Sequence, residues 1–279
     1  MIRSKLTLAK VEIASIVLLS AVFMMAVLSF MPEGYFGRAS SAPYLPPSLS
    51  NLLGTNDLGD DVLRTLLQGS RVSLSIGALG AMVSTIIGAL VGIFAGFMGG
   101  IIDEIMSSFT DIFMVVPALP LMIVLAAYLG SSFLNVVIVI GLLWWTTTAR
   151  LVRARARQIR GAPFIEGLVG LGASKLYIML RHVLPNVWGV VFARFVLAVS
   201  SSILLESGLS FIGLGDPQNP SWGMMLHFAM TRGALLYGAW WTFVPPGLCI
   251  SITSLGFILL GMGLEWRYKM STKSISDLL

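Results

Sequence analysis

The chain has 279 residues, of which 56% are hydrophobic and only 11% are charged, and its mean hydropathy is +0.89. This composition excludes a soluble globular domain and is typical of a polytopic membrane protein. The net charge of +5 does not indicate a nucleic-acid partner, because the basic residues flank apolar runs and form no compact basic domain with interleaved aromatic residues.

Six apolar runs are long enough to cross the hydrocarbon core, which takes about 20 residues per helix. We therefore predict an all-α integral membrane protein with six transmembrane helices and both termini on one side. The expected spans are residues 11–31, 72–98, 105–129, 133–151, 187–206 and 240–264.

Lysine and arginine set the orientation, because basic residues near span ends resist translocation during insertion. A cytoplasmic N-terminus leaves 14 of the 18 lysines and arginines on the cytoplasmic side, which predicts cytoplasmic termini and a multi-pass protein of the cell membrane. The basic residues then left outside are Arg38, Arg64, Arg71 and Arg232. The chain divides into a tail with the first span (1–31), an extracytoplasmic segment (32–71), a transmembrane domain (72–264) and a C-terminal tail (265–279).

The first apolar run follows basic residues, as the core of a signal peptide does. It reaches about 20 residues, however, and ends at Met31-Pro-Glu-Gly without a small-x-small cleavage pattern, which favours a retained first span. The single cysteine, Cys249, excludes an intrachain disulfide and a cysteine-built metal site, and we expect it to be a small apolar residue of the last span.

The segment between the first two spans begins as a proline- and serine-rich linker at 42–48. Farther on, Val62, Leu66 and Leu67 follow Asp60 and Asp61 at helical spacing, which predicts a short outer helix with acids at its start. The acids and arginines here are interpreted as a solvated rim, with a ligand contact as the alternative.

The second span carries Gly88, Gly92, Gly96 and Gly100, which form a flat stripe at four-residue spacing. In lipid, such stripes allow helix backbones to approach closely. We expect the stripe to pack within this bundle; a translocation route or a homologous partner subunit are the alternatives.

The third span places Asp111 about two turns inside the membrane, where an unpaired carboxylate is costly. Pro117 and Pro120 then interrupt the helical hydrogen bonds and predict a kink. We expect Asp111 to pair with an arginine from the cytoplasmic end of another span rather than to relay protons, because no second membrane acid or histidine lies at nearby helical spacing.

Span five is followed by a stretch rich in glycine, proline and aromatic residues, which predicts turns at the outer membrane surface. This stretch is interpreted as a re-entrant or interfacial connection, or as the lip of an outer gate. We expect Trp222 at interfacial depth and Glu206 in a gating or structural salt bridge.

The segment 150–185 is basic and punctuated by glycine, and lies between two long apolar runs. After an arginine cluster that suits lipid headgroups, Pro163 fits a first helical position and Glu166 fits the first turn of that helix. Leu168 and Leu171 form a small apolar face, and Gly170 and Gly172 end the helix.

Ser174 can cap a second short helix in which Lys175, Arg181 and His182 lie off the apolar face, and Pro185 closes it. Two short helices with a glycine hinge between membrane spans form a lever whose displacement would move spans four and five together. This is a mechanical device rather than a catalytic one.

The pattern Glu166-x5-Gly172-x11-Leu184-Pro185 resembles the cytoplasmic loop of ABC-importer permeases. Further blocks are similar to the C-type permease of dipeptide, oligopeptide and nickel importers, and the similarity runs from about 53 to 264. These blocks are Leu53-Gly-Thr-Asn-Asp-Leu-Gly-Asp-Asp-Val-Leu, Arg71-Val-Ser-Leu, Gly172-Ala-Ser, Arg181-His-Val-Leu-Pro-Asn and Leu209-Ser-Phe-Ile-Gly-Leu-Gly with Trp222-Gly.

The resemblance implies a type I ABC-importer permease fold whose loop, about 152–186, forms a coupling helix that docks on a separate ATPase subunit. By position, the docking residues are Glu166, Gly167, Leu168, Gly172, Ala173, Ser174, Leu184 and Pro185. Gly167 and Leu168 replace the family's two alanines, Asp60 stands where arginine is usual, and Gly261-Met-Gly-Leu-Glu-Trp departs from the usual C-terminal motif.

The chain should not hydrolyse ATP itself, because the nearest approach to a phosphate loop, Gly167 to Gly172, lacks the following lysine. His182 and His227 are far apart in sequence, so a histidine-built metal or catalytic site is not expected, and neither is a cofactor.

The resemblance implies the membrane subunit of an ATP-driven importer, together with a second permease, two ATPase subunits and an extracytoplasmic binding protein. Peptides are the favoured cargo, with oligosaccharides and nickel as alternatives. An ion-coupled secondary transporter would instead show paired membrane carboxylates or an inverted repeat. An assembly or insertion factor would need no coupling loop.

Overall fold

The computed structural model describes residues 2–31 and 42–276, with side chains for 11–31 and 42–267. Regular structure in this part of the chain is helical, apart from an isolated bridge between Thr55 and Asp61. The predicted all-α membrane fold is therefore confirmed. Arg38 and the side chains of Arg3, Lys5, Lys10, Lys269 and Lys273, which carried part of the orientation argument, lie outside the described residues.

Eleven helices and two short helical turns follow one another along the described part of the chain. Their bounds are α1 (Ile2–Leu28), α2 (Val62–Met98), α3 (Gly100–Val115), α4 (Ala118–Leu129), α5 (Phe133–Leu143), α6 (Thr146–Arg160), α7 (Pro163–Gly170), α8 (Lys175–Ile178), the π-helical turn η1 (Met179–Val183), α9 (Leu184–Phe211), α10 (Trp222–Thr231), the 3₁₀ turn η2 (Trp240–Thr242) and α11 (Val244–Ser276).

Four helical stretches in the described part of the chain are long and apolar enough to cross a membrane unbroken. Two bent helix pairs raise this number to six when each pair counts as one span, in agreement with the predicted six spans. The unbroken stretches are Val11–Leu28, Val62–Met98, Lys175–Phe211 and Trp240–Arg267, and the bent pairs are α3 with α4 and α5 with α6.

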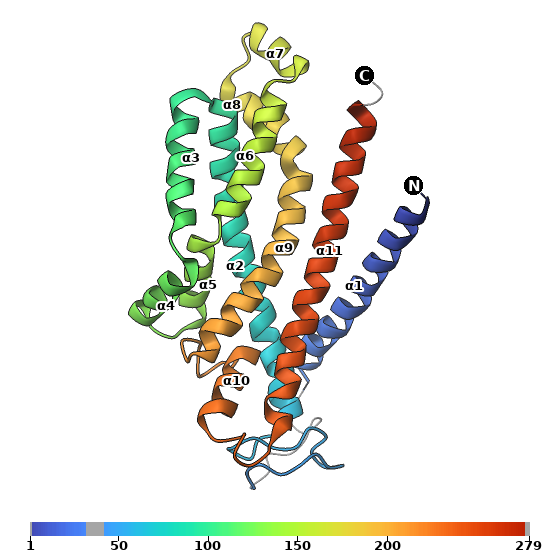
Figure 1. The fold of residues 1–279 in the computed structure, drawn as a ribbon, viewed down its shortest axis with the longest axis vertical. Helices are drawn as coiled ribbons and strands as arrows, with labels where there is room; N and C mark the ends of the chain where they lie inside the picture. The colour runs from blue at the N-terminus through green and yellow to red at the C-terminus, as the bar shows by residue number, and fades with distance from the viewer. Residues whose placement is uncertain (1, 32–41, 277–279) are drawn as a thin grey trace.

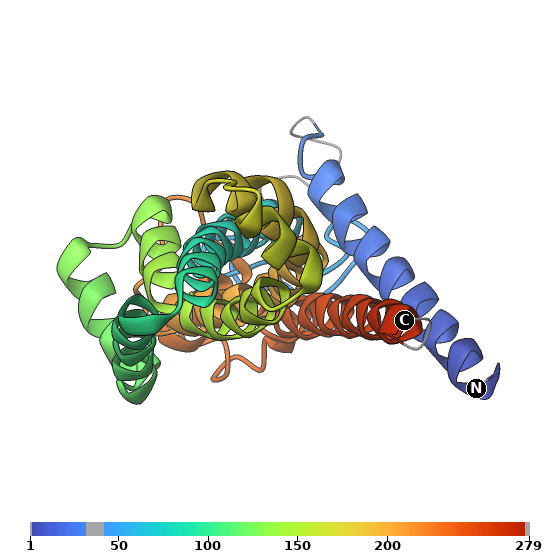
Figure 2. The ribbon, with the colours of Figure 1, turned by 90° about the horizontal axis from the view of Figure 1, so that it is seen from above.

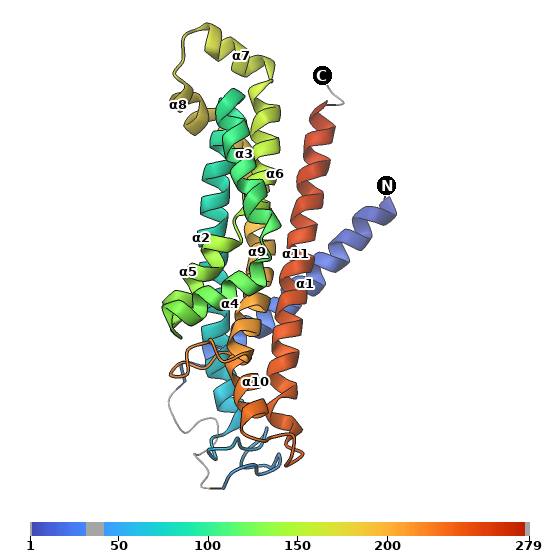
Figure 3. The ribbon, with the colours of Figure 1, turned by 60° about the vertical axis from the view of Figure 1, so that its left-hand side comes forward.

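The helices form an elongated bundle (Figure 1). The turn between α6 and α8, with α7, projects beyond the bundle at one end, and α10 with the segment 42–61 lies at the other. The start of α1 and the end of α11 both point toward the α7 end (Figures 1 and 3). Seen from above, α1 lies outside α11, and α3 with α4 lies at the opposite edge (Figure 2).

The expected short outer helix is not separate, because α2 is continuous over 37 residues from Val62 to Met98. The Asp61 carboxylate caps it by accepting a hydrogen bond from the Arg64 backbone N–H at 3.0 Å. Gly69 lies inside this helix, where Trp222 and Met225 pack against it. The boundary expected at residue 71 therefore falls inside a helix.

The third span bends by 84° between α3 and α4, which confirms the kink expected near Pro117. Pro117 is the N-cap of α4, and Val116 before it is extended, as a residue preceding proline prefers. The fourth span was expected to be continuous, but α5 and α6 meet at 42° around Trp144 and Trp145. The second part, α6, continues to Arg160 and carries the arginine cluster on a helix.

The glycine stripe of α2 packs against α6, as expected for packing within the bundle. A Cβ atom at Gly88, Gly92 or Gly96 would lie 2.6, 2.6 or 2.4 Å from a backbone carbonyl oxygen of α6 or of Trp145 before it. Gly100 does not belong to this contact: it lies beyond the end of α2 with φ +55° and has nothing within 4 Å.

Pro185 was expected to end a helix, and this prediction is wrong. Lys175–Phe211 is one continuous helical stretch in which Pro185 lies near the start of α9. The π-helical turn Met179–Val183 precedes it. Proline lacks a backbone N–H and its ring clashes with the carbonyl one turn earlier, and a wide π turn relieves this conflict without breaking the helix.

Candidate coupling segment and outer polar site

The segment 161–184 projects from one end of the bundle and presents several of the predicted docking residues to solvent (Figure 3). Pro163 begins α7 and Glu166 lies in its first turn, as predicted. Glu166 and Gly167 are exposed, and nothing lies within 4 Å of a Cβ built at Gly167. These two positions are therefore open to a partner.

Large apolar side chains are exposed on the same segment. Leu171 is 86% exposed, and five further large apolar residues are about half exposed or more: Phe164, Val169, Leu176, Tyr177 and Leu180. Leu168 and Leu171 were expected to form one apolar face, and this prediction is wrong. Leu171 lies after the end of α7 and is exposed, whereas Leu168 is half-buried. An exposed apolar patch of this kind on a projecting turn is characteristic of a protein-binding surface.

The segment is also anchored to the bundle. Ile165 of α7 is 1% exposed, and Ile178 of α8 is fully buried. Both pack in an apolar cluster that includes Phe97 of α2, Ile159 of α6 and Val187 of α9. Because interiors are close-packed, a displacement of α7 is transmitted to three long helices.

The turn between the two short helices has the local chemistry that the sequence predicted. Gly172 has φ +79°, a conformation that glycine adopts without strain. The Ser174 hydroxyl then caps α8 by accepting a hydrogen bond from the Tyr177 backbone N–H at 3.3 Å.

The remaining predicted docking residues differ in accessibility. Leu168, Ala173 and Leu184 are half-buried and pack against the anchoring cluster. Pro185 is exposed. The enlarged side chain at Leu168 therefore contributes to anchoring, whereas the outward surface is formed by Glu166, Gly167 and the apolar residues named above.

Two ion pairs join α3 to α6 near the α7 end. Asp111 lies 2.7 Å from Arg150, which is the type of pairing expected for this acid. Asp103 accepts two hydrogen bonds from Arg153, at 2.5 and 2.9 Å. The second pair is more buried, with side-chain exposures of 29% and 11% against 58% and 57% for the first.

Glu206 is fully buried near the C-terminal end of α9. Its carboxyl accepts hydrogen bonds from Ser210 at 2.6 Å and Ser207 at 3.4 Å. The expected salt bridge is wrong for the part of the chain that the structure describes, since hydroxyl groups and not a cation surround this acid. Burial explains the difference, because a buried carboxyl requires hydrogen-bond donors and serines supply them from the same helix.

Trp222 is fully buried within the bundle, and the interfacial depth expected for it stays a prediction. Its indole Nε1–H donates to the Leu66 carbonyl at 3.0 Å, and its backbone N–H donates to the Ser73 hydroxyl at 3.1 Å. These two hydrogen bonds tie the start of α10 to α2.

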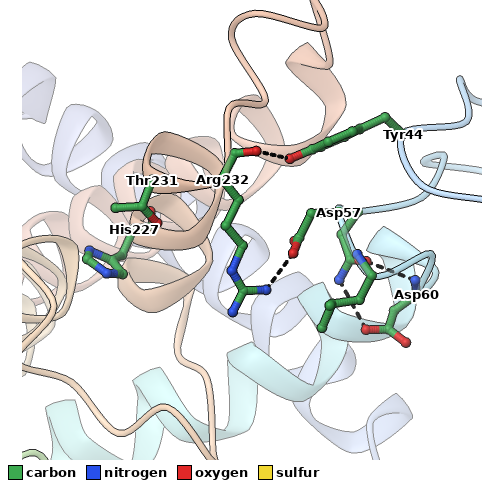
Figure 4. Close-up of polar contacts among 8 residues, drawn as sticks. Tyr44, Asp57, Asp60, His227, Thr231 and Arg232 are labelled. Carbon is green, nitrogen blue, oxygen red and sulfur yellow. Dashed lines mark hydrogen bonds and ion pairs between the residues drawn. The ribbon is translucent and has the colours of Figure 1, made fainter.

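A polar cluster joins the segment 42–61 to the end of α10 (Figure 4). The Arg232 guanidinium donates to Asp57 at 2.6 Å and lies 4.0 Å from the Phe228 ring centre. Tyr44 donates its hydroxyl to the Arg232 carbonyl at 2.7 Å. Burial and the nearby Asp57 carboxylate raise the pKa of Tyr44, which keeps this donor protonated.

Sequence reasoning missed this cluster, because Asp57 and Arg232 are 175 residues apart and no local pattern pairs them. The two histidines lie apart: His182 packs edge-on against Tyr177 in the segment 161–184, and His227 contacts the Phe211 carbonyl near the opposite end. The residues described contain no group of three or more potential metal ligands.

A bundle of bent and continuous spans with a projecting, apolar helical turn defines a membrane transport subunit. Residues 88–269 match the family described as the binding-protein-dependent transport system inner membrane component, and the chain belongs to this family. It is thus a membrane-embedded transport subunit.

Curated relatives cover most of the chain. It is 32% identical over 260 residues to a dipeptide transport system permease protein of Bacillus subtilis, covering 92% of this chain and 80% of that protein. It is 32% identical to an oligopeptide transport system permease protein of the same organism, with coverages of 92% and 84%. A glutathione transport system permease protein of Escherichia coli is 34% identical over 246 residues, with coverages of 88% and 80%.

Proposed function

We propose that this chain is the permease subunit of an ATP-driven importer for short peptides. A second permease would enclose the path with it, two separate ATPase subunits would supply the energy, and an extracytoplasmic binding protein would deliver the cargo. The relatives named above, which are permeases for dipeptides, oligopeptides and glutathione, support the peptide cargo.

The observation that carries the coupling role is the combination of outward apolar exposure and inward anchoring in one segment. Leu171 and Tyr177 are exposed, whereas Ile165 and Ile178 are locked between α2, α6 and α9. An ATPase that grips the outward surface would move these helices as it closes on nucleotide. Glu166, Gly167, Gly172, Ser174 and Pro185 belong to this outward surface, and Leu168, Ala173 and Leu184 support it.

Glu206 and Trp222 are proposed to hold the outer end of the path closed. Both are fully buried, and Trp222 connects α10 to α2 through two hydrogen bonds. Asp111, paired with Arg150, is proposed to be structural rather than part of a proton relay.

The coupling role is tested with the double variant Glu166→Lys and Gly172→Leu. The first change reverses an exposed charge, and the second places a side chain where φ is +79°. We expect a membrane-inserted permease that binds the ATPase more weakly and has lost ATP-driven uptake of a dipeptide in proteoliposomes.

The matched control is Glu104→Lys, which reverses an exposed acid at the same end of the bundle but outside the segment. This control should transport normally. Unchanged uptake by the double variant would contradict the coupling role, and dipeptide uptake by the isolated chain driven by an ion gradient would contradict the importer itself.

A further inference from the structure

A pocket of about 370 Å³ lies at the outer end of the bundle, remote from the coupling segment. The loop at Asn56–Asp60, the first turns of α2, the turn 217–220 and α10 form its walls. This volume falls within the range of small-molecule sites, about 300 to 1,000 Å³. None of the roles proposed above uses it.

The walls are held in place by contacts among the described residues. The Asn56 side-chain oxygen accepts hydrogen bonds from the backbone N–H groups of Leu58 at 2.9 Å and Asp60 at 2.8 Å. Its amide donates to Asp60 Oδ2 at 3.2 Å. On the opposite wall, Asp57 and the Phe228 ring fix Arg232 (Figure 4). The pocket is therefore a cavity with fixed walls rather than a gap between loops.

The lining carries balanced charge and an apolar body. Two carboxylates, of Asp57 and Asp60, and two guanidinium groups, of Arg64 and Arg232, line the pocket together with Val62, Met225 and Phe228. Such a lining discriminates against ligands of a single charge sign, because one pair of wall charges would repel them. It suits a molecule with one ammonium group, one carboxylate and an apolar side chain.

We propose that this pocket is a receiving subsite for a short peptide, in which Asp60 binds the α-ammonium group and Arg232 binds the α-carboxylate. A guanidinium has five N–H donors, so Arg232 can bind a carboxylate while it keeps its contact with Asp57. The proposal rests on the proposed peptide import. It adds that the permease itself, and not only a binding protein, contacts both ends of the cargo.

The test uses the assembled permease and ATPase complex in nanodiscs without binding protein, with alanyl-phenylalanine as the probe. Saturation-transfer NMR should detect weak binding of this dipeptide. The N-acetylated dipeptide and the C-terminal amide should each bind about tenfold more weakly, as expected when one charge-assisted hydrogen bond is lost.

Asp60→Asn should weaken binding of the free dipeptide but not of its N-acetylated form. Arg232→Gln should weaken binding of the free dipeptide but not of its C-terminal amide. The matched controls are Asp216→Asn and Arg71→Gln, which remove outer charges that do not line the pocket. Both controls should bind as the wild type does. Thermal unfolding of each variant separates a lost contact from a lost fold.

Two outcomes would overturn the subsite: no dipeptide binding to the complex, or equal binding by variants and wild type. ATP-driven dipeptide uptake by the complete importer is measured in parallel. If uptake persists in either of these cases, the peptide-import proposal survives and only the subsite fails. If the wild type takes up no dipeptide at all, the proposed function itself fails.

Discussion

The ion pairs between α3 and α6 show how the surroundings of one residue decide what its charge contributes. Both pairs join an aspartate of α3 to an arginine of α6, but Asp103 and Arg153 are more buried and make two hydrogen bonds. Asp111 and Arg150 are more than half exposed. Bidentate arginine–carboxylate pairs are stronger than pairs joined by a single hydrogen bond.

A double-mutant cycle with Asp103→Asn and Arg153→Gln should therefore give a coupling energy of about 1 to 3 kcal/mol. The same cycle with Asp111→Asn and Arg150→Gln should give a smaller coupling energy, because that pair is joined by a single hydrogen bond. Thermal unfolding of the purified chain in detergent measures both. Equal coupling energies would contradict the role assigned to the second hydrogen bond.

Trp222 offers a second test at the residue scale. Trp222→Phe removes the donor to the Leu66 carbonyl while it keeps a large ring, and should destabilise the protein by about 1 to 2 kcal/mol. The control is Trp240→Phe, at a tryptophan more than half exposed, and should be close to neutral. Differential scanning fluorimetry makes this comparison, and equal melting temperatures for the two variants would argue against the tie between α10 and α2.

At the scale of elements, periodicity and composition predicted the spans because each must be long and apolar, and this constraint is local. The cap at Ser174, the helix start at Pro163 and the kink at Pro117 were equally local. What the sequence did not predict depends on packing: the extension of α2 to Val62, and the π turn that carries the chain through Pro185.

The candidate site residues also divide into those that local sequence predicts and those that depend on tertiary packing. The outward position of Glu166 followed from the pattern around it, whereas the inward tie at Ile165 and the pairing of Asp57 with Arg232 needed the tertiary structure. Glu206 and Trp222 were singled out by their unusual stretch of sequence. Their burial could not be foreseen, because density of turn residues says nothing about what packs over them.

The contact between α2 and α6 gives a prediction at this scale. Gly96→Ala would place a Cβ 2.4 Å from the Arg153 carbonyl oxygen, so the helices must separate, at a cost of about 1 to 3 kcal/mol. Gly208→Ala is the matched control, since nothing lies within 4 Å of that helical position. A lower melting temperature is expected for the first variant only, and an unperturbed Gly96→Ala protein would refute the close contact.

At the scale of the whole molecule, the segment 161–184 and the polar cluster around Arg232 lie at opposite ends of the bundle (Figure 1). The distribution of basic residues predicts that the first end is cytoplasmic. Leu171 and Leu236, exposed by 86% and 90%, are suited to test this by replacement with cysteine after Cys249→Ala.

A membrane-impermeant maleimide should label Leu236→Cys in intact cells and Leu171→Cys only after the membrane is opened. The reverse labelling pattern would show that the orientation is inverted, and with it the assignment of the two ends.

The most direct measurement of the central claim, that the projecting segment couples this chain to an ATPase, is crosslinking from the same two positions. In the assembled importer, Leu171→Cys bearing a short photoreactive group should crosslink to the ATPase subunit, with a yield that changes between nucleotide-free and ATP-bound states. Leu236→Cys should give no such product. Absence of an ATPase crosslink from Leu171→Cys, in a complex that still imports peptide on ATP, would contradict the account.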